Sequence, residues 1–217
     1  MNVDLFVSSY PRLFHMAELG TWPSIKVRGL MSTMAVLDHL NIKGHKRALI
    51  EAEHRPEKIT LGTKDNQIVL RDQKPMEPER LQQGLIDGTT VNEWYKLING
   101  KVFFWAEESR LLRLLNARHY RNLTHDVLTI DTAALVRKYE KSIWLSHMNS
   151  GNTLPVPHPR GVSLFKRISA YPTNKRGTRP AKEVVEVVVD YSVPDIAKYV
   201  TMVRRMSGSN LLEVQEL

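Results

Sequence analysis

Short apolar runs alternate with segments of helical periodicity along the chain. The runs are Leu13–Met16, Gln67–Arg71, Lys101–Trp105, Asp126–Ile130, Ile143–Leu145 and Val184–Val189. β-Branched and aromatic residues dominate most of them, which favours strands over helices. The last run reads VVEVVV and is the strongest strand candidate in the chain.

Helix signals fill the intervals between these runs. Thr21 can cap a helix that Gly29 ends, and Ser32 or Thr33 can begin a second one. Thr90 and Glu93 have the spacing of a capping box. The predicted helices are Thr21–Gly29, a segment from Ser32 through Leu40, His45–His54, Thr90–Ile98, Ser109–Asn122, Thr132–Lys141 and a last one from Asp195 to about Met206. No repeat or linker separates the elements, so residues 1–217 are expected to form one mixed α/β domain.

Composition removes several classes of protein. The chain has 217 residues and no cysteine, which excludes disulfide scaffolds, thiolate metal sites and cysteine nucleophiles. No apolar run reaches the roughly 18 residues that a membrane span needs, so a cytoplasmic protein without a membrane partner is expected. Eight histidines lie without metal-ligand spacing, and no metal site is expected.

Charge is distributed unevenly. The net charge is +8, and the stretch from Lys141 to Lys182 holds no Asp or Glu. Its second half contains the loop YPTNKRGTRP at Tyr171–Pro180. A flexible cationic loop attracts polyanions, and nucleic acid is the default candidate. A merely solvated basic loop is the competing interpretation.

A single polar residue interrupts two of the apolar strands. His15 lies within Leu13–Met16, and Glu186 shares one strand face with Val184 and Val188. If that face is buried, Glu186 needs a partner or a chemical task; if the strand is at an edge, Glu186 is merely solvated. His15 is likewise either a hydrogen-bonded core residue or a functional one.

Three segments resemble the DarT family of toxin ADP-ribosyltransferases. FHMAELGTWPSIKVRGLMS at Phe14–Ser32 resembles the opening signature, and VEVVVDYSVP at Val185–Pro194 is similar to the closing strand. KVFFWAEESRLL, beginning at Lys101, falls where that family has an aromatic strand followed by a loop and helix. The chain differs by having Gly20-Thr21-Trp22 in place of Asn-Leu and Glu107 in place of an arginine, with Arg110 three residues later.

The resemblance implies an α+β fold with an ADP-ribosyltransferase-like split β-sheet core and surrounding short helices. It implies NAD as co-substrate and no metal. Glu186 and Arg110 would be catalytic. The NAD-binding candidates are His15, Ser32, Thr33, Phe104 and Trp105, and the nucleic-acid-binding candidates are Arg113, Asn149, Lys175, Arg176 and Arg179. The acid-free stretch would then lie near the active site.

The expected activity is transfer of ADP-ribose from NAD to a base in DNA or RNA, by a bacterial toxin or anti-phage effector that an antitoxin protein can neutralise. Two alternatives stay open. An RNA 2′-phosphotransferase-like enzyme would use His15 and the arginines and need no catalytic glutamate. A non-catalytic basic module on a degenerate transferase fold would bind nucleic acid but not NAD.

Overall fold

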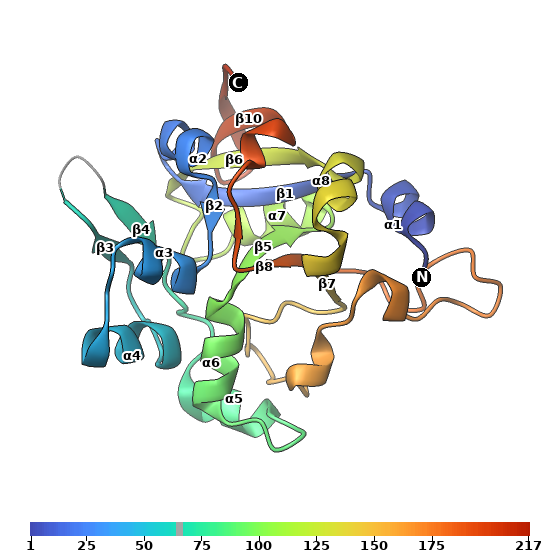
Figure 1. Cartoon of the computed structure of the whole chain (residues 1–217), viewed down its shortest axis with the longest axis horizontal. Helices are drawn as coiled ribbons and strands as arrows, with labels where there is room; N and C mark the ends of the chain where they lie inside the picture. The colour runs from blue at the N-terminus through green and yellow to red at the C-terminus, as the bar shows by residue number, and fades with distance from the viewer. Residues whose placement is uncertain (64–66) are drawn as a thin grey trace.

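An antiparallel sheet of seven strands forms the centre of the computed structural model, which describes residues 1–63 and 67–217 (Figure 1). Its order is β11-β10-β6-β1-β5-β8-β7. In chain order the strands are β1 (Arg12–Glu18), β5 (Lys101–Trp105), β6 (Thr124–Asp131), β7 (Ile143–Ser146), β8 (Glu186–Asp190), β10 (Val200–Ser207) and β11 (Asn210–Gln215). Strands from both ends of the chain meet in this sheet, and helices are interspersed among them. The α+β class is therefore confirmed.

Eight α-helices surround the sheet in the described part of the chain. They are α1 (Val3–Ser9), α2 (Trp22–Arg28), α3 (Thr33–His39), α4 (Gly44–Ala52), α5 (Pro78–Gly84), α6 (Val91–Asn99), α7 (Glu108–Leu115) and α8 (Thr132–Tyr139). Two predicted caps are present: Ser32 accepts from Ala35 N, and Thr90 and Glu93 form a full capping box. Thr21 precedes α2 but makes no capping hydrogen bond, because its hydroxyl donates to the Glu18 carbonyl instead. Local side-chain chemistry thus determines where these helices begin.

Two small sheets accompany the large one. β2 (Leu30–Met31) pairs with β9 (Ser192–Val193), and β3 (Ile59–Leu61) pairs with β4 (Ile68–Leu70). The β2–β9 pair joins the two ends of the chain beside the large sheet. Together with α3 and α4, the β3–β4 hairpin lies on the left of Figure 1.

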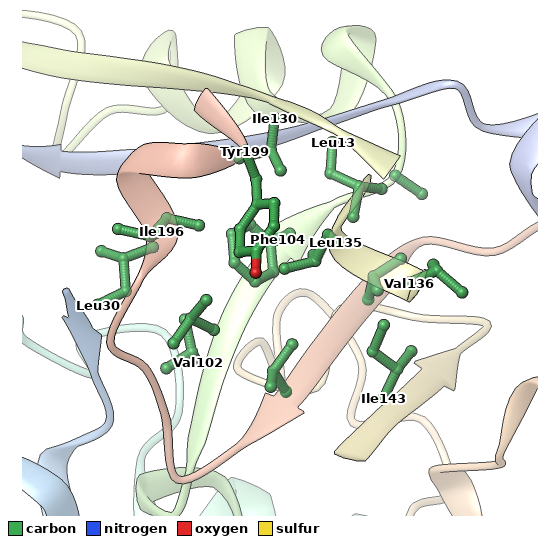
Figure 2. Packing of buried hydrophobic residues seen from close by; sticks show 14 of the residues in the cluster. Leu13, Leu30, Val102, Phe104, Ile130, Leu135, Val136, Ile143, Ile196 and Tyr199 are labelled. Carbon is green, nitrogen blue, oxygen red and sulfur yellow. The ribbon is translucent and has the colours of Figure 1, made fainter. Parts of the chain in front are cut away.

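Each face of the large sheet is covered by helices. On one face, Leu135 and Val136 of α8 pack toward Phe104 and Val102 of β5 in the main core (Figure 2). On the other face, Leu111 of α7 and its neighbour Leu115 pack against Phe14 and Met16 of β1. The side chains of β1 and β5 therefore face packed layers on both sides of the sheet.

The large sheet opens between β1 and β5. β1 pairs with β6 along its whole length, from Arg12 to Glu18, whereas Phe14 opposite Trp105 is the one register pair between β1 and β5 in the described residues. Beyond that pair the His15 ring, not the backbone, contacts β5. Apart from Trp105, the edge of β5 that faces β1 has no register partner on β1 in the described residues.

The first and last signature segments are in direct contact. Gly29 ends α2 with a φ of 83° and lies against the closing segment. A Cβ on Gly29 would lie 2.4 Å from the Cα of Pro194, so only glycine fits. Close backbone approach explains why a glycine precedes β2.

Two helix predictions are wrong in extent or type. The predicted helix from Asp195 to Met206 is instead a short 3-10 turn, Ile196–Lys198, followed by β10. Its buried residues Val200, Val203 and Met206 recur every three positions for two reasons: a bulge between Val200 and Met202 places Val200 and Val203 on the same face, in the main core, whereas Met206 is buried on the opposite face of the sheet.

The helix predicted for Ser109–Asn122 ends at Leu115. The chain leaves the helix there, which brings the Tyr120 ring beneath the guanidinium of Arg71.

Among the helices of the described residues, none combines the length and the apolar character needed to cross a bilayer.

Candidate functional site

A cavity of about 400 Å³ lies where the sheet opens between β1 and β5. His15–Glu18 of β1 and all five residues of β5 line it, together with parts of β2, α3 and β4. The loop Asn149–Gly151 and Glu186 complete the lining. This volume lies in the range that proteins use for small-molecule ligands.

Glu186 is buried beside this cavity. β8 lies between β5 and β7, and Glu186 is directly opposite Trp105 on one side and Ser146 on the other. Its side chain is 4% exposed, so the interpretation of a solvated edge residue is wrong. Burial raises the pKa of Glu186 to about 7, although hydrogen bonding by Ser150 and the charge of Arg160 oppose the rise. At neutral pH this carboxyl can therefore both take up and release a proton.

The loop that contacts Glu186 is held by a buried arginine. The backbone N–H of Ser150 donates to Glu186 Oε2 at 3.1 Å. Arg160 is 1% exposed and donates from Nη1 to Ser150 O at 2.9 Å and from Nη2 to Asn152 O at 2.8 Å. The Thr153 hydroxyl bonds the carbonyl of Pro75 at 2.8 Å. These contacts hold in place the Ser150 N–H group from which Glu186 accepts a hydrogen bond.

His15 is neutral in the folded protein. Burial, with a smaller contribution from the charge of Arg71, lowers its pKa to about 4, although a hydrogen bond to Phe103 opposes the shift. Nδ1 lies 2.8 Å from the carbonyl oxygen of Phe103. A carbonyl only accepts, so Nδ1 carries the proton and Nε2 keeps a free lone pair. His15 can therefore accept a hydrogen bond from a hydroxyl in the cavity.

The open sheet brings side chains from opposite faces to one cavity. Strand alternation places His15 on the face of Phe104 and Glu186 on the face of Trp105. In a continuous sheet the backbone would separate the two. Here both line the same cavity, because it extends around the free edge of β5.

The four other NAD-binding candidates also line the cavity. Ser32 is buried and its hydroxyl caps α3, whereas Thr33 is half-buried. The Phe104 ring belongs to the main core and lies 5.8 Å from the His15 ring. Trp105 is half-buried beside Glu186, so it is the better placed of the two aromatics to stack on a ligand.

The structure does not bring the arginine candidates of α7 to this site. Arg110 forms an ion pair with Glu183, and neither Arg110 nor Arg113 is among the described residues that line the cavity. Of the nucleic-acid candidates, Asn149 does line it, with its Oδ1 accepting from Gly151 N at 3.0 Å.

The other nucleic-acid candidates lie on an exposed hairpin. Residues 173–180, called the basic hairpin below, are closed by a bridge between Thr173 and Pro180. The segment lies beside α1, at the right of Figure 1 and away from β2 and α3. Lys175, Arg176 and Arg179 line a shallow hollow of about 480 Å³ there and are not among the described residues of the cavity. The acid-free stretch therefore reaches the cavity through Asn149–Gly151, whereas the cations of the basic hairpin lie outside its described lining.

Three arginines that sequence reasoning missed line the cavity: Arg28, Arg55 and Arg71. Arg28 lies within the opening signature, which could have drawn attention to it. Arg55 and Arg71 lie in segments without any motif. They flank the β3–β4 hairpin, which packs with α3 and α4, and only the folded chain brings them to the cavity. Within the described residues, no group of three or more histidine and acidic side chains is arranged to hold a metal ion.

Comparison with known families assigns the chain to one of them. A family described as a "family of unknown function (DUF7002)" matches residues 11–200. The chain belongs to this family. The matched residues of DUF7002 include β1, β5 and β8 and thus the whole cavity lining described above. No curated protein and no solved structure matches the chain.

Proposed function

We propose that this protein transfers ADP-ribose from NAD to a nucleic-acid base. The observation that carries the proposal is the convergence of Glu186, His15 and Trp105 on one cavity in an opened sheet. This is the order of polar and aromatic strands that the resemblance to the DarT family implies. An ADP-ribosyltransferase-like split sheet is part of the same proposal.

The lining fits a dinucleotide in its chemistry. A half-buried aromatic beside a buried carboxyl suits nicotinamide next to its ribose. The free lone pair of His15 Nε2 suits a ribose hydroxyl, and Ser32 and Thr33 add polar groups. The arginines of the cavity suit phosphate groups. When bound, NAD supplies a ribose carbon that is activated by a positively charged leaving group.

The proposed transfer breaks one bond and forms one. The bond from ribose C1′ to the nicotinamide nitrogen breaks, and its electron pair leaves with nicotinamide, which becomes neutral. A nitrogen or oxygen of the acceptor bonds to C1′ and loses its proton to the Glu186 carboxylate. The ionised carboxylate also stabilises the positive charge that develops on the ribose. A carboxyl whose pKa is about 7 is suited to both tasks near neutral pH.

Nucleic acid is the proposed acceptor because the protein is basic. The net charge of +8 and the exposed cations of the basic hairpin support a polyanionic partner. Since the hairpin is not part of the cavity, we propose that it holds the nucleic-acid backbone at a distance from the reacting base. A cytoplasmic toxin or anti-phage role, with an antitoxin as partner, follows only from the resemblance.

Incubation with labelled NAD tests the proposal. Wild type and Glu186→Gln are each mixed with labelled NAD and, separately, single-stranded DNA and RNA. We expect wild type to label one of the two nucleic acids. Glu186→Gln should lose at least about a hundredfold in rate, because it lacks the proton acceptor. Full activity of a folded Glu186→Gln would overturn the role of Glu186 and favour the 2′-phosphotransferase-like alternative.

One observation favours a non-catalytic module as second candidate. Arg110, the arginine nearest to the family's catalytic position, pairs with Glu183 outside the cavity lining. Under this alternative, Arg176→Glu with Arg179→Glu removes nucleic-acid retention while no NAD is consumed. A matched control reverses the exposed Lys43 and Lys46 near α4. Label transfer by wild type would exclude this candidate.

A further inference from the structure

Arg71, which is half-buried, differs from the buried arginines Arg55 and Arg160 in that one of its guanidinium nitrogens has no hydrogen-bond partner. Arg55 donates from Nε to the carbonyl of Arg71 at 2.6 Å and from Nη1 to that of Ile50 at 3.2 Å. Arg160 binds three backbone carbonyls. For Arg71, by contrast, Nη1 is buried and has no hydrogen-bond partner, and no ion pair forms with it in the described residues.

An aromatic ring holds the Arg71 guanidinium at the cavity. Its Cζ lies 4.8 Å from the centre of the Tyr120 ring, and both residues line the cavity. The Tyr120 hydroxyl donates to Asp72 Oδ1 at 3.0 Å, which fixes the ring. Since Arg55 also binds the Arg71 carbonyl, both the backbone and the head group of Arg71 are held in place.

The nearby charges do not neutralise Arg71. Glu18 is paired with Lys58 at 2.7 Å, and Asp72 accepts the Tyr120 hydroxyl. Burial, and to a smaller extent the Arg71 charge, lowers the pKa of both His15 and His125, so neither imidazole competes for an anion at neutral pH. Arg71 is half-buried and lines the cavity without an ion pair in the described residues, so an anion bound in the cavity can compensate its charge.

We propose that Arg71, seated on the Tyr120 ring, is the anion-binding residue of the cavity and binds a phosphate group of a nucleotide ligand. A planar guanidinium matches two phosphate oxygens at once, and stacking leaves its edge available for them. The identity of the nucleotide rests on the proposed function. The phosphate belongs either to the NAD diphosphate or to the backbone of the acceptor.

Calorimetric titration of the full chain with ADP, adenosine and a single-stranded ten-nucleotide DNA separates these sources. We expect Arg71→Gln to weaken ADP binding about tenfold to a hundredfold and to leave adenosine binding unchanged. The matched control is Arg137→Gln, an exposed cation on α8. A loss confined to the DNA titration assigns the phosphate to the acceptor and also supports the anion site.

Unchanged affinity of folded Arg71→Gln for both ADP and DNA overturns the inference. If this variant does not fold, Arg71→Lys takes its place, because it keeps the charge but cannot bind two oxygens in a planar fork. Arg71→Lys must also lose affinity; full retention overturns the proposed geometry. Arg71-dependent ADP binding without any transfer from NAD would leave this inference standing while the proposed function fails. If Arg71→Gln still transfers ADP-ribose with an unchanged KM for NAD and an unchanged affinity for DNA, this inference fails while the proposed function stands.

Discussion

The buried Glu186 makes the free energy of unfolding depend on pH, and its burial determines the sign of that dependence. The pKa rises from an ordinary value of 4.5 to about 7 in the folded protein. The folded state therefore binds more protons than the unfolded state between these values, and stability falls as the pH rises from 4.5 to 7. Each pKa unit corresponds to about 1.4 kcal/mol, so the ionised form costs about 3 kcal/mol above pH 7.

Glu186→Gln removes this cost without changing the shape of the side chain. The glutamine oxygen can still accept the Ser150 N–H, and the amide resembles the protonated acid. We expect the variant to match wild type below pH 4.5 and to exceed it by up to about 3 kcal/mol at pH 8. Urea denaturation at half-unit pH intervals measures the difference. The exposed Glu53 provides the control variant, Glu53→Gln, which should show no such trend.

A stability difference that stays constant from pH 4.5 to 8 would refute the reasoning, because it would mean that Glu186 does not titrate differently on folding. A larger advantage of the variant at low pH would have the wrong sign. The expected result has a functional meaning. A side chain that destabilises the ionised fold, and whose replacement stabilises it while abolishing transfer, is retained for chemistry.

Two further predictions concern the support of the cavity. Burial lowers the pKa of His125 to about 4, so its protonation should cost wild type up to about 3 kcal/mol as the pH falls from 6.5 to 4. His125→Phe should lose less stability than wild type over this pH range, as measured by urea denaturation. An equal loss of stability in the two proteins would contradict this. Gly29→Ala should lose more than about 3 kcal/mol through its clash with Pro194, whereas Gly20→Ala, which has a φ of 74° and open space, should lose only about 1 kcal/mol. Equal losses in thermal unfolding would show that the clash is relieved.

Local patterns predicted most of the elements that carry the site. The apolar runs at Leu13–Met16 and Lys101–Trp105 correspond to β1 and β5, and the interruption at Glu186 falls on β8. Strand propensity and capping chemistry act over a few residues and can be read from the sequence. β10 was predicted as a helix, and its buried residues do have a spacing of three, because a bulge separates Val200 from Val203 and because Val203 and Met206 are buried on opposite faces of the sheet.

The remaining part of the site depends on contacts between distant segments. Nothing near Arg71 indicates that Tyr120 lies under it, since the two come from different elements and meet only in the folded chain. Nothing near Arg160 in the sequence indicates its role either. Its side chain holds the Ser150 segment, whose N–H donates a hydrogen bond to Glu186. The pKa of Glu186 is likewise a property of its burial between β5 and β7, which the alternation of one strand could not decide.

The opening of the sheet is the feature on which the proposed chemistry depends most. A strand residue faces one side of a sheet or the other, so His15 and Glu186 would be separated by backbone if β1 and β5 paired throughout. After Phe14, the His15 ring contacts β5 in place of a backbone ladder, and the free edge of β5 lies in the cavity. One ligand can then contact the neutral imidazole on one face and the buried carboxyl on the other. Under the proposed function His15 has two tasks: its Nε2 would accept a hydrogen bond from the ligand, and its Nδ1 bonds the Phe103 carbonyl of β5.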